Sequence, residues 1–140
     1  MRGVKLHLPA FFTLIVIQWL WGGLWYGALF SQAWMTAVGK SEAELQAMSG
    51  PIMYVVPVVG AALEIWLLNA IMQKTGETTV ADGLKWGALL WLCFIFSTMW
   101  INNSFSGSPF ALTLIDSAKE LGGLLICGAV LGAWRPKAAA

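Results

Sequence analysis

Charged residues are scarce in this chain: Lys, Arg, Asp and Glu make up 11% of its 140 residues. Soluble domains carry about 25% charged residues, so this share excludes an ordinary water-exposed surface over most of the chain. The formal net charge is only +1 and no dense basic stripe occurs, which removes the electrostatic footprint of a protein that binds nucleic acid. The composition therefore indicates lipid as the main solvent.

Residues that catalyse reactions or hold metal ions are also few. The chain has one histidine, His7, and two cysteines, Cys93 and Cys127, each inside or beside an apolar run. No nucleophile–base pair and no set of metal ligands can be assembled from these residues. We therefore expect no enzymatic activity, no metal and no cofactor. The cysteines are most simply small buried packing residues, and a disulfide between them is the alternative.

Long apolar runs are what the sequence has in abundance. Apolar residues make up 59% of the chain, and about 20 residues at 1.5 Å each cross a hydrocarbon core of about 30 Å as a helix. Four runs predict membrane spans at about residues 8–34, 51–72, 80–100 and 109–134. The expected fold is all-α: an integral membrane four-helix bundle with short loops, in a single domain over residues 1–140. A signal peptide is the alternative for the first run, but that run is too long and too rich in tryptophan.

Capping signals separate the runs. Ser41 followed three residues later by Glu44 has the spacing of a capping box and predicts a short amphipathic surface helix that ends at about Met48. Thr79 with Asp82 has the same spacing and predicts the start of the third span.

The positive charges predict the orientation in the membrane. With four spans, six lysines and arginines fall on the side that holds both termini, and only Lys40 falls on the other. The six are Arg2, Lys5, Lys74, Lys85, Arg135 and Lys137. Cytoplasmic loops carry the excess of such residues, so we expect a protein of the bacterial inner membrane with both termini in the cytoplasm.

Glycines spaced four residues apart occur in three of the runs, and this spacing lets two helices approach closely. Packing inside one bundle is the simplest interpretation, and a face between copies is the alternative. Besides the lipid bilayer, we expect a homo-oligomer or a larger membrane complex as partner. The pairs are Gly23 with Gly27, Gly83 with Gly87, and Gly128 with Gly132.

Three ionisable residues interrupt the fourth run within five positions: Asp116, Lys119 and Glu120. A charge deep in a bilayer costs a few kcal/mol or more unless it is paired or hydrated. The second run contains Glu64, about 20 Å along its helix, whereas Lys119 and Glu120 lie about 15–16 Å along theirs. Gln18 falls near the middle of the first run. We therefore predict that Glu64, Lys119, Glu120 and Gln18 meet at one depth, with Asp116 at a different level.

The charges of this candidate network do not balance. Three carboxylates face one lysine, and we predict that at least one carboxyl, that of Glu64 or Glu120, holds a proton near neutral pH. One hypothesis is a network that joins two helices of a structural or accessory subunit, or of a lipid- or small-ligand-binding module. The alternative is an oligomeric proton- or cation-coupled transporter or channel that uses the buried carboxylates, since ionisable groups inside membranes are functional candidates by default.

A set of short motifs is spread over nearly the whole chain. The motifs are Trp25–Tyr26, Leu29–Phe30, Trp34, Gly39, Ser41–Leu45, Trp91–Phe94, Asn103, Phe105, Gly107, Ile115–Asp116 and Gly128–Trp134. Together they resemble a bacterial membrane family catalogued as a domain of unknown function, number seventeen sixty-one. The resemblance implies a four-helix membrane protein, but no activity, cofactor or catalytic residue. An aromatic residue commonly stands in that family where this chain has Lys119, so the resemblance does not extend the Lys119 network to the family.

Overall fold

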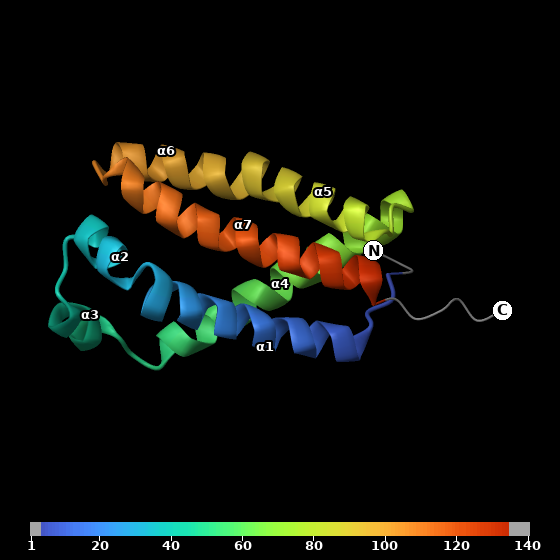
Figure 1. Cartoon of the computed structure of the whole chain (residues 1–140), viewed down its shortest axis with the longest axis horizontal. Coiled ribbons are helices and arrows are strands. Elements are labelled where there is room, and N and C mark those ends of the chain that lie inside the picture. Colours follow the sequence, from blue (N-terminus) through green and yellow to red (C-terminus); the bar gives the residue numbers. More distant parts are fainter. Residues whose placement is uncertain (1–3, 135–140) are drawn as a thin grey trace.

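A computed structural model of the chain describes residues 4–134, and within that range it contains helices and no strand (Figure 1). The first long segment is built from three pieces in a row. These are α1 (Leu8–Leu24), a π-helical turn η1 (Trp25–Leu29) and α2 (Ser31–Val38). A short loop leads to α3 (Glu42–Met48), and α4 (Ile52–Thr75) then returns along the molecule.

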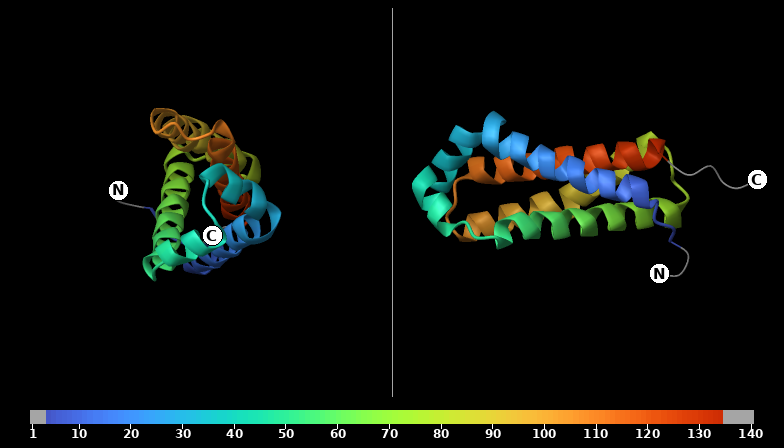
Figure 2. Two further views of the ribbon diagram at one scale, coloured as in Figure 1. Left: turned by 90° about the vertical axis from the view of Figure 1, so that its left-hand side faces the viewer. Right: turned by 90° about the horizontal axis from the view of Figure 1, so that it is seen from below.

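The second half of the described chain has a similar plan. It consists of α5 (Val80–Leu90), a π-helical turn η2 (Trp91–Phe96), α6 (Ser97–Phe105) and the long α7 (Phe110–Ala133). The long segments run side by side (Figure 2): α7 packs most closely on α5 and also contacts α1 and α4, while α1 packs on α4. This arrangement places α7 in contact with every other long segment.

Three segments are long and apolar enough to cross a membrane: Leu8–Leu29, Ile52–Thr75 and Val80–Phe105. They coincide with three of the four predicted spans, whose ends shift by a few residues. The residues of the fourth predicted span also form a helix, α7, which has 24 residues like α4. Its three ionisable residues set it apart from the other three segments.

The predicted spans at about residues 8–34 and 80–100 are not single α-helices. A π-helical turn interrupts each of them, at η1 and η2, and the first segment bends again at Phe30 before α2 begins. A π turn holds one residue more than an α turn, and composition carries no signal for it.

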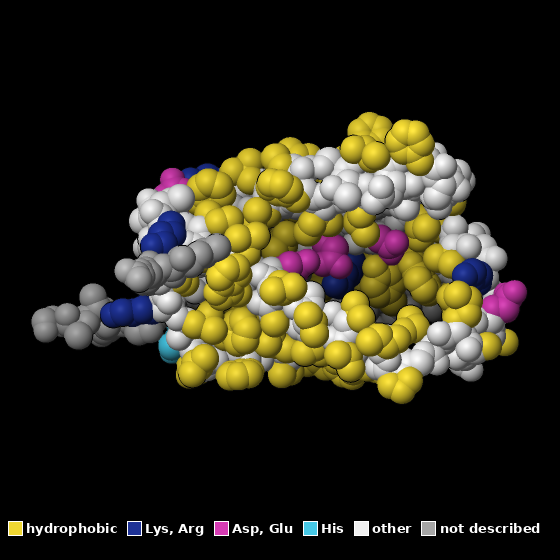
Figure 3. All heavy atoms as spheres, turned by 180° about the vertical axis from the view of Figure 1, so that it is seen from behind, with side chains coloured by type: hydrophobic (Ala, Val, Ile, Leu, Met, Phe, Trp, Pro, Cys, Tyr) yellow, Lys and Arg dark blue, Asp and Glu magenta, His cyan; other side chains and the backbone are white. Residues whose placement is uncertain are grey.

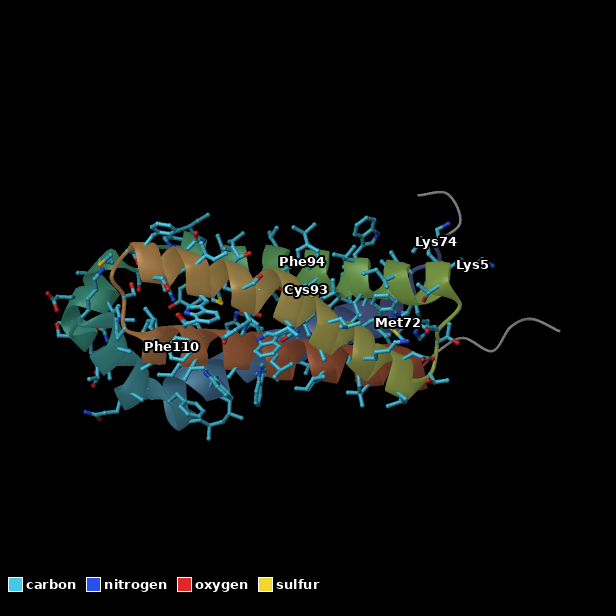
Figure 4. The ribbon with its side chains drawn as sticks, turned by 90° about the horizontal axis from the view of Figure 1, so that it is seen from above. Lys5, Met72, Lys74, Cys93, Phe94 and Phe110 are labelled. Carbon is cyan, nitrogen blue, oxygen red and sulfur yellow. The ribbon has the colours of Figure 1, made fainter. Side chains whose placement is uncertain are left out.

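Both ends of the described chain lie at the same end of the molecule. The ring of His7 packs edge-on against the ring of Trp134, with their centroids 5.3 Å apart. Figure 4 shows Lys5 and Lys74 at this end and Phe110 at the other. Three of the charges used to predict the orientation, at positions 2, 135 and 137, lie outside the described residues.

Glycines bring α5 and α7 into backbone contact. A Cβ added to Gly83 would lie 2.5 Å from the carbonyl carbon of Gly128, and one added to Gly87 would lie 2.9 Å from the carbonyl oxygen of Leu124. The prediction of close helix approach is confirmed for this pair of helices. For Gly23 and Gly27 the prediction of close packing within one bundle is wrong, because a Cβ added at either position would meet no atom within 4 Å.

The two capping boxes are confirmed. The backbone amide of Glu44 donates to the Ser41 hydroxyl while the Glu44 carboxylate accepts from the Ser41 backbone amide at 2.8 Å. Thr79 and Asp82 repeat this pattern at the start of α5, with a distance of 2.9 Å from the Thr79 amide to the Asp82 carboxylate.

The cysteines differ from the prediction of two buried thiols. Cys127 is buried, but Cys93 is exposed on the outer face of η2 near the middle of the molecule (Figure 4), and neither forms a disulfide. The face of η2 that holds Cys93 points away from the protein. An exposed position can therefore lie within a strongly apolar stretch.

The hydrophobic core occupies only part of the molecule. It lies between α1, α4 and α7 and includes Leu14, Ile65, Leu68, Met72 and Leu124, all of which are almost fully buried. The first third of α4 takes no part in it, since residues 52–59 are exposed at every position. The molecule is therefore closely packed toward the end that holds Lys74 and open farther along α4.

Candidate functional site

A cavity of about 800 Å³ lies between α1, α4 and α7, where α4 leaves the core. Apolar residues of α1 and α4 make most of its walls, and α7 contributes Lys119 and Glu120. Figure 3 shows the hollow on one long face of the molecule, with acidic and basic side chains recessed between apolar surfaces. The cavity therefore combines a charged interior with an apolar surround.

Small residues keep this space open. Gly22 and Gly23 of α1 and Gly60 and Ala61 of α4 line the cavity, and a Cβ added to Gly23 or Gly60 would meet no atom within 4 Å. Pro57 lies one turn above Ala61 on the same wall. Pro57, Gly60 and Ala61 therefore lie on the same face of α4 as Glu64.

Lys119 and Glu120 form an ion pair with each other. The Lys119 Nζ donates to Glu120 Oε1 at 2.9 Å, and the two side chains are 16% and 23% exposed. Adjacent residues of a helix do not normally face one another, so the long lysine side chain must bend back along α7 to reach its neighbour. This pairing leaves the cavity with one further carboxylate.

That carboxylate is Glu64, which lines the cavity from α4 and is only partly exposed. Within residues 4–134 it makes no hydrogen bond and no ion pair. Glu64, Lys119, Glu120 and Gln18 all line one cavity, and their action as one network stays a prediction. Which of the carboxyls holds a proton stays a prediction from the charge count.

Gln18 forms the buried edge of the cavity. It is 5% exposed, its Nε2 donates to the Sγ of Cys127 at 3.2 Å, and its Oε1 has no hydrogen-bond partner. The amide lies over Gly123 of α7, where an added Cβ would come within 2.8 Å of Nε2. Glycine at position 123 is therefore what admits the glutamine side chain.

Asp116 is not among the residues that line the cavity. Its Oδ1 accepts hydrogen bonds from the Tyr26 hydroxyl at 2.9 Å and from the Trp34 Nε1 at 3.0 Å. Two uncharged donors from η1 and α2 thus hold this carboxylate. The sequence analysis missed both donors, because their positions depend on the bends at η1 and Phe30.

Tryptophans also hold the charged segment of α7 through its backbone. The indole N–H of Trp21, Trp25 and Trp91 donate to the carbonyl oxygens of Lys119, Ile115 and Ser117, at 2.9, 3.1 and 2.7 Å. Trp25 and Trp91 belong to the two π-helical turns, which are frequent at functional sites. Hydropathy and residue spacing do not predict these contacts, because they depend on which faces of the helices meet.

The described residues offer no metal site. Within residues 4–134 no group of three or more His, Cys, Asp and Glu side chains is arranged to hold a metal ion. The chemistry that the cavity does offer is electrostatic: one neutral ion pair, one further carboxylate and an amide oxygen without a partner.

These features define an all-helical protein with three segments able to cross a membrane. A charged cavity lies beside α7, the helix that contacts all the other long segments. Comparison with known proteins gives the family. The model of the family described as "Protein of unknown function (DUF1761)" matches residues 10–132, and the chain belongs to that family. The resemblance noted in the sequence is thereby confirmed. Neither a search of curated proteins nor a search of solved structures returns a match.

Proposed function

We propose that this protein is a four-helix integral membrane protein that binds a small amphiphilic ligand in the cavity between α1, α4 and α7. The observation that carries the proposal is the combination of apolar walls, a charged interior and a volume of about 800 Å³ in one cavity. Ligand pockets typically have about 300–1,000 Å³ and mostly apolar walls with a few polar groups. The proposed role is binding, without a catalytic step.

The proposal takes α7 as the fourth span. Ionisable residues inside membranes almost always face a bundle interior or a cavity, and those of α7 do so: Lys119 and Glu120 line the cavity and Asp116 is held by Tyr26 and Trp34. The 24 residues of α7 are enough to cross a hydrocarbon core at 1.5 Å per residue.

The proposed location is the bacterial inner membrane, with both termini in the cytoplasm. Lys5 and Lys74 lie at the end where the described chain begins and ends (Figure 4). Lys40 lies in the loop before α3, beyond the opposite end of the first segment. This distribution supports the orientation expected from the positive-inside rule.

Filling the cavity tests the binding proposal. Gly60→Leu and Gly23→Leu each add a side chain to a wall where there is open space, and Gly27→Leu is the matched control because Gly27 also has open space but does not line the cavity. A dodecanol that carries a photoreactive diazirine would be added to the protein in lipid nanodiscs, and labelled residues would be mapped by mass spectrometry.

We expect the wild-type protein and Gly27→Leu to be labelled at cavity residues such as Met53, Tyr54 and Gly60. We expect Gly60→Leu and Gly23→Leu to lose most of that labelling, because the added side chains occupy the space. Equal labelling in all four proteins would count against ligand binding in the cavity.

A second candidate function is proton- or cation-coupled transport, which the unpaired carboxylate of Glu64 favours. Flux of protons and of monovalent cations into proteoliposomes would be compared for the wild type and Glu64→Gln, with Glu42→Gln on the surface helix as the control. Equal flux in the wild type and Glu64→Gln would remove Glu64 from such a mechanism. Assembly into a homo-oligomer or a larger complex stays a prediction, for native mass spectrometry to check.

A further inference from the structure

We infer that the ligand of this cavity is a cation: an amphiphile with a single primary or secondary ammonium head, which binds beside Glu64, and an apolar tail along the first third of α4. The inference rests on the proposed function and adds the chemical class of the ligand. Three properties of the cavity support the inference separately: the charge of its lining residues, the hydrogen-bonding capacity of its unpaired atoms and the shape of its walls.

The charge count of the cavity favours a cation. The only basic side chain among the lining residues, Lys119, is already paired with Glu120 at 2.9 Å. Glu64 then remains as the one carboxylate without a partner in the described part of the chain. In the absence of a ligand a proton on one carboxyl neutralises this charge, and a single positive head group can take the place of that proton. An anionic head group would instead meet two carboxyl groups and a lysine that is already engaged. Buried charges are tolerated when they are paired.

The unpaired polar atoms narrow the head group further. They are the carboxylate oxygens of Glu64, which lines the cavity, and, at the buried edge of the cavity, the Oε1 of Gln18, which lies against Gly123 of α7. All of these atoms are hydrogen-bond acceptors when the carboxyl is ionised. The occupant must therefore bring donors. A primary ammonium has three N–H donors, while a quaternary ammonium has the same charge and none.

The walls indicate where the apolar part lies. Met53, Val56 and Pro57 line the cavity on the exposed third of α4, and Leu20 and Leu24 line it from α1. Met53 is 11 positions before Glu64, which is about 16 Å along the helix. An alkyl tail can follow this apolar length while its head stays at Glu64, and the hollow on the long face of the molecule (Figure 3) gives that tail access to lipid.

A set of four photoreactive probes tests the inference. All carry the same diazirine-bearing dodecyl chain, and their head groups are a primary ammonium, a trimethylammonium, a hydroxyl and a carboxylate. Each would be added to the full chain in phosphatidylcholine nanodiscs, and labelling of cavity residues would be quantified by mass spectrometry. Glu64→Gln removes the carboxylate charge, and Glu42→Gln makes the same chemical change on the exposed face of α3.

We expect the primary ammonium to label the cavity about tenfold more strongly than the hydroxyl probe, as hydrogen bonds to a charged group allow. The trimethylammonium probe should fall between them. Glu64→Gln should lower labelling by the ammonium about tenfold and leave labelling by the hydroxyl probe unchanged, which also shows that the variant is folded. Glu42→Gln should match the wild type.

The other outcomes separate the inference from the proposed function. Equal labelling by all four probes, with no effect of Glu64→Gln, would overturn the cationic ligand while ligand binding stands. Strongest labelling by the carboxylate probe would overturn it in favour of an anion at Lys119. Equal labelling by the two cations would overturn the requirement for N–H donors. Labelling of cavity residues no stronger than that of lipid-facing residues, with every probe, would overturn the proposed function itself.

Discussion

At the scale of single residues, Asp116 shows how a carboxylate is kept inside a mostly apolar helix without a cation beside it. Its Oδ1 receives the Tyr26 hydroxyl and the Trp34 indole N–H, and the two aromatic rings pack edge to face with centroids 5.2 Å apart. The aromatic pair therefore supplies both donors and the apolar cover. Lys119, three positions farther along α7, is paired with Glu120.

Removing one of these donors tests the importance of the contact. Tyr26→Phe should lower the free energy of unfolding by about 1–3 kcal/mol, because it leaves the carboxylate with one donor fewer. Tyr54→Phe is the control, since the Tyr54 side chain is exposed and its hydroxyl makes no hydrogen bond within residues 4–134. Unfolding by SDS in mixed micelles would measure the difference. An equal loss in both variants would show that the hydrogen bond to Asp116 does not stabilise the fold.

At the scale of helices, the sequence predicts where elements lie better than how they face one another. Hydropathy and caps place all the long segments and the surface helix α3, because length, apolar content and cap spacing are local properties. They do not reveal η1 and η2. Each π turn adds about one residue to a helix, which rotates every later side chain by about 100°. The contact of Trp34 with α7 depends on this rotation.

The candidate site was predictable in the same way: the sequence indicates where its residues lie along the helices but not which of them make contact. Counting 1.5 Å per residue brings Glu64, Lys119, Glu120 and Gln18 to one depth, and all four line the cavity. Depth does not say which groups pair, so the bond between Lys119 and its neighbour Glu120 was not foreseen. The cavity itself results from side chains that are absent at Gly23 and Gly60, and such a void has no signal in a single sequence.

The contact of α5 with α7 gives a prediction about helix packing. Gly128→Ala should destabilise the protein by about 2 kcal/mol or more, because the new Cβ would overlap the backbone of Gly83, which cannot rotate away. Gly23→Ala makes the same change where space is open and should be neutral or stabilising by up to about 1 kcal/mol. Thermal unfolding in detergent would compare the two. Equal stability of the two variants would mean that α5 and α7 do not approach this closely.

The start of α3 gives a prediction about pH. The Ser41 backbone amide and, second, the Ser41 hydroxyl hold the pKa of the Glu44 carboxyl below its ordinary value of 4.5. The stabilisation is therefore fully present above pH 4.5 and is lost as the pH falls through the lower value of the folded state. Hydrogen-exchange protection of the α3 amides should fall over that range. In Glu44→Gln, protection should be nearly independent of pH there, and a fall equal to that of the wild type would exclude Glu44 as its source.

At the scale of the whole molecule, both ends of the described chain lie at the same end of the molecule. This arrangement gives a test of the proposed topology. Single cysteines would replace Lys5, Lys74 and Lys40 in a chain whose natural cysteines are serine. A maleimide that cannot cross membranes should label the cysteine that replaces Lys40 in intact spheroplasts. It should label those at Lys5 and Lys74 only after the membrane is opened. The reverse pattern would invert the proposed orientation, and labelling of all three in intact cells would exclude it.

The hollow on the long face of the molecule has a consequence for how a ligand arrives. A site that opens between helices rather than at their ends takes its ligand from the bilayer, so the concentration that governs occupancy is the concentration dissolved in lipid. An amphiphile that partitions strongly into membranes is presented to Glu64 at far higher concentration than its aqueous level suggests. A modest intrinsic affinity is then enough to fill the cavity, and the membrane itself contributes the first stage of selection.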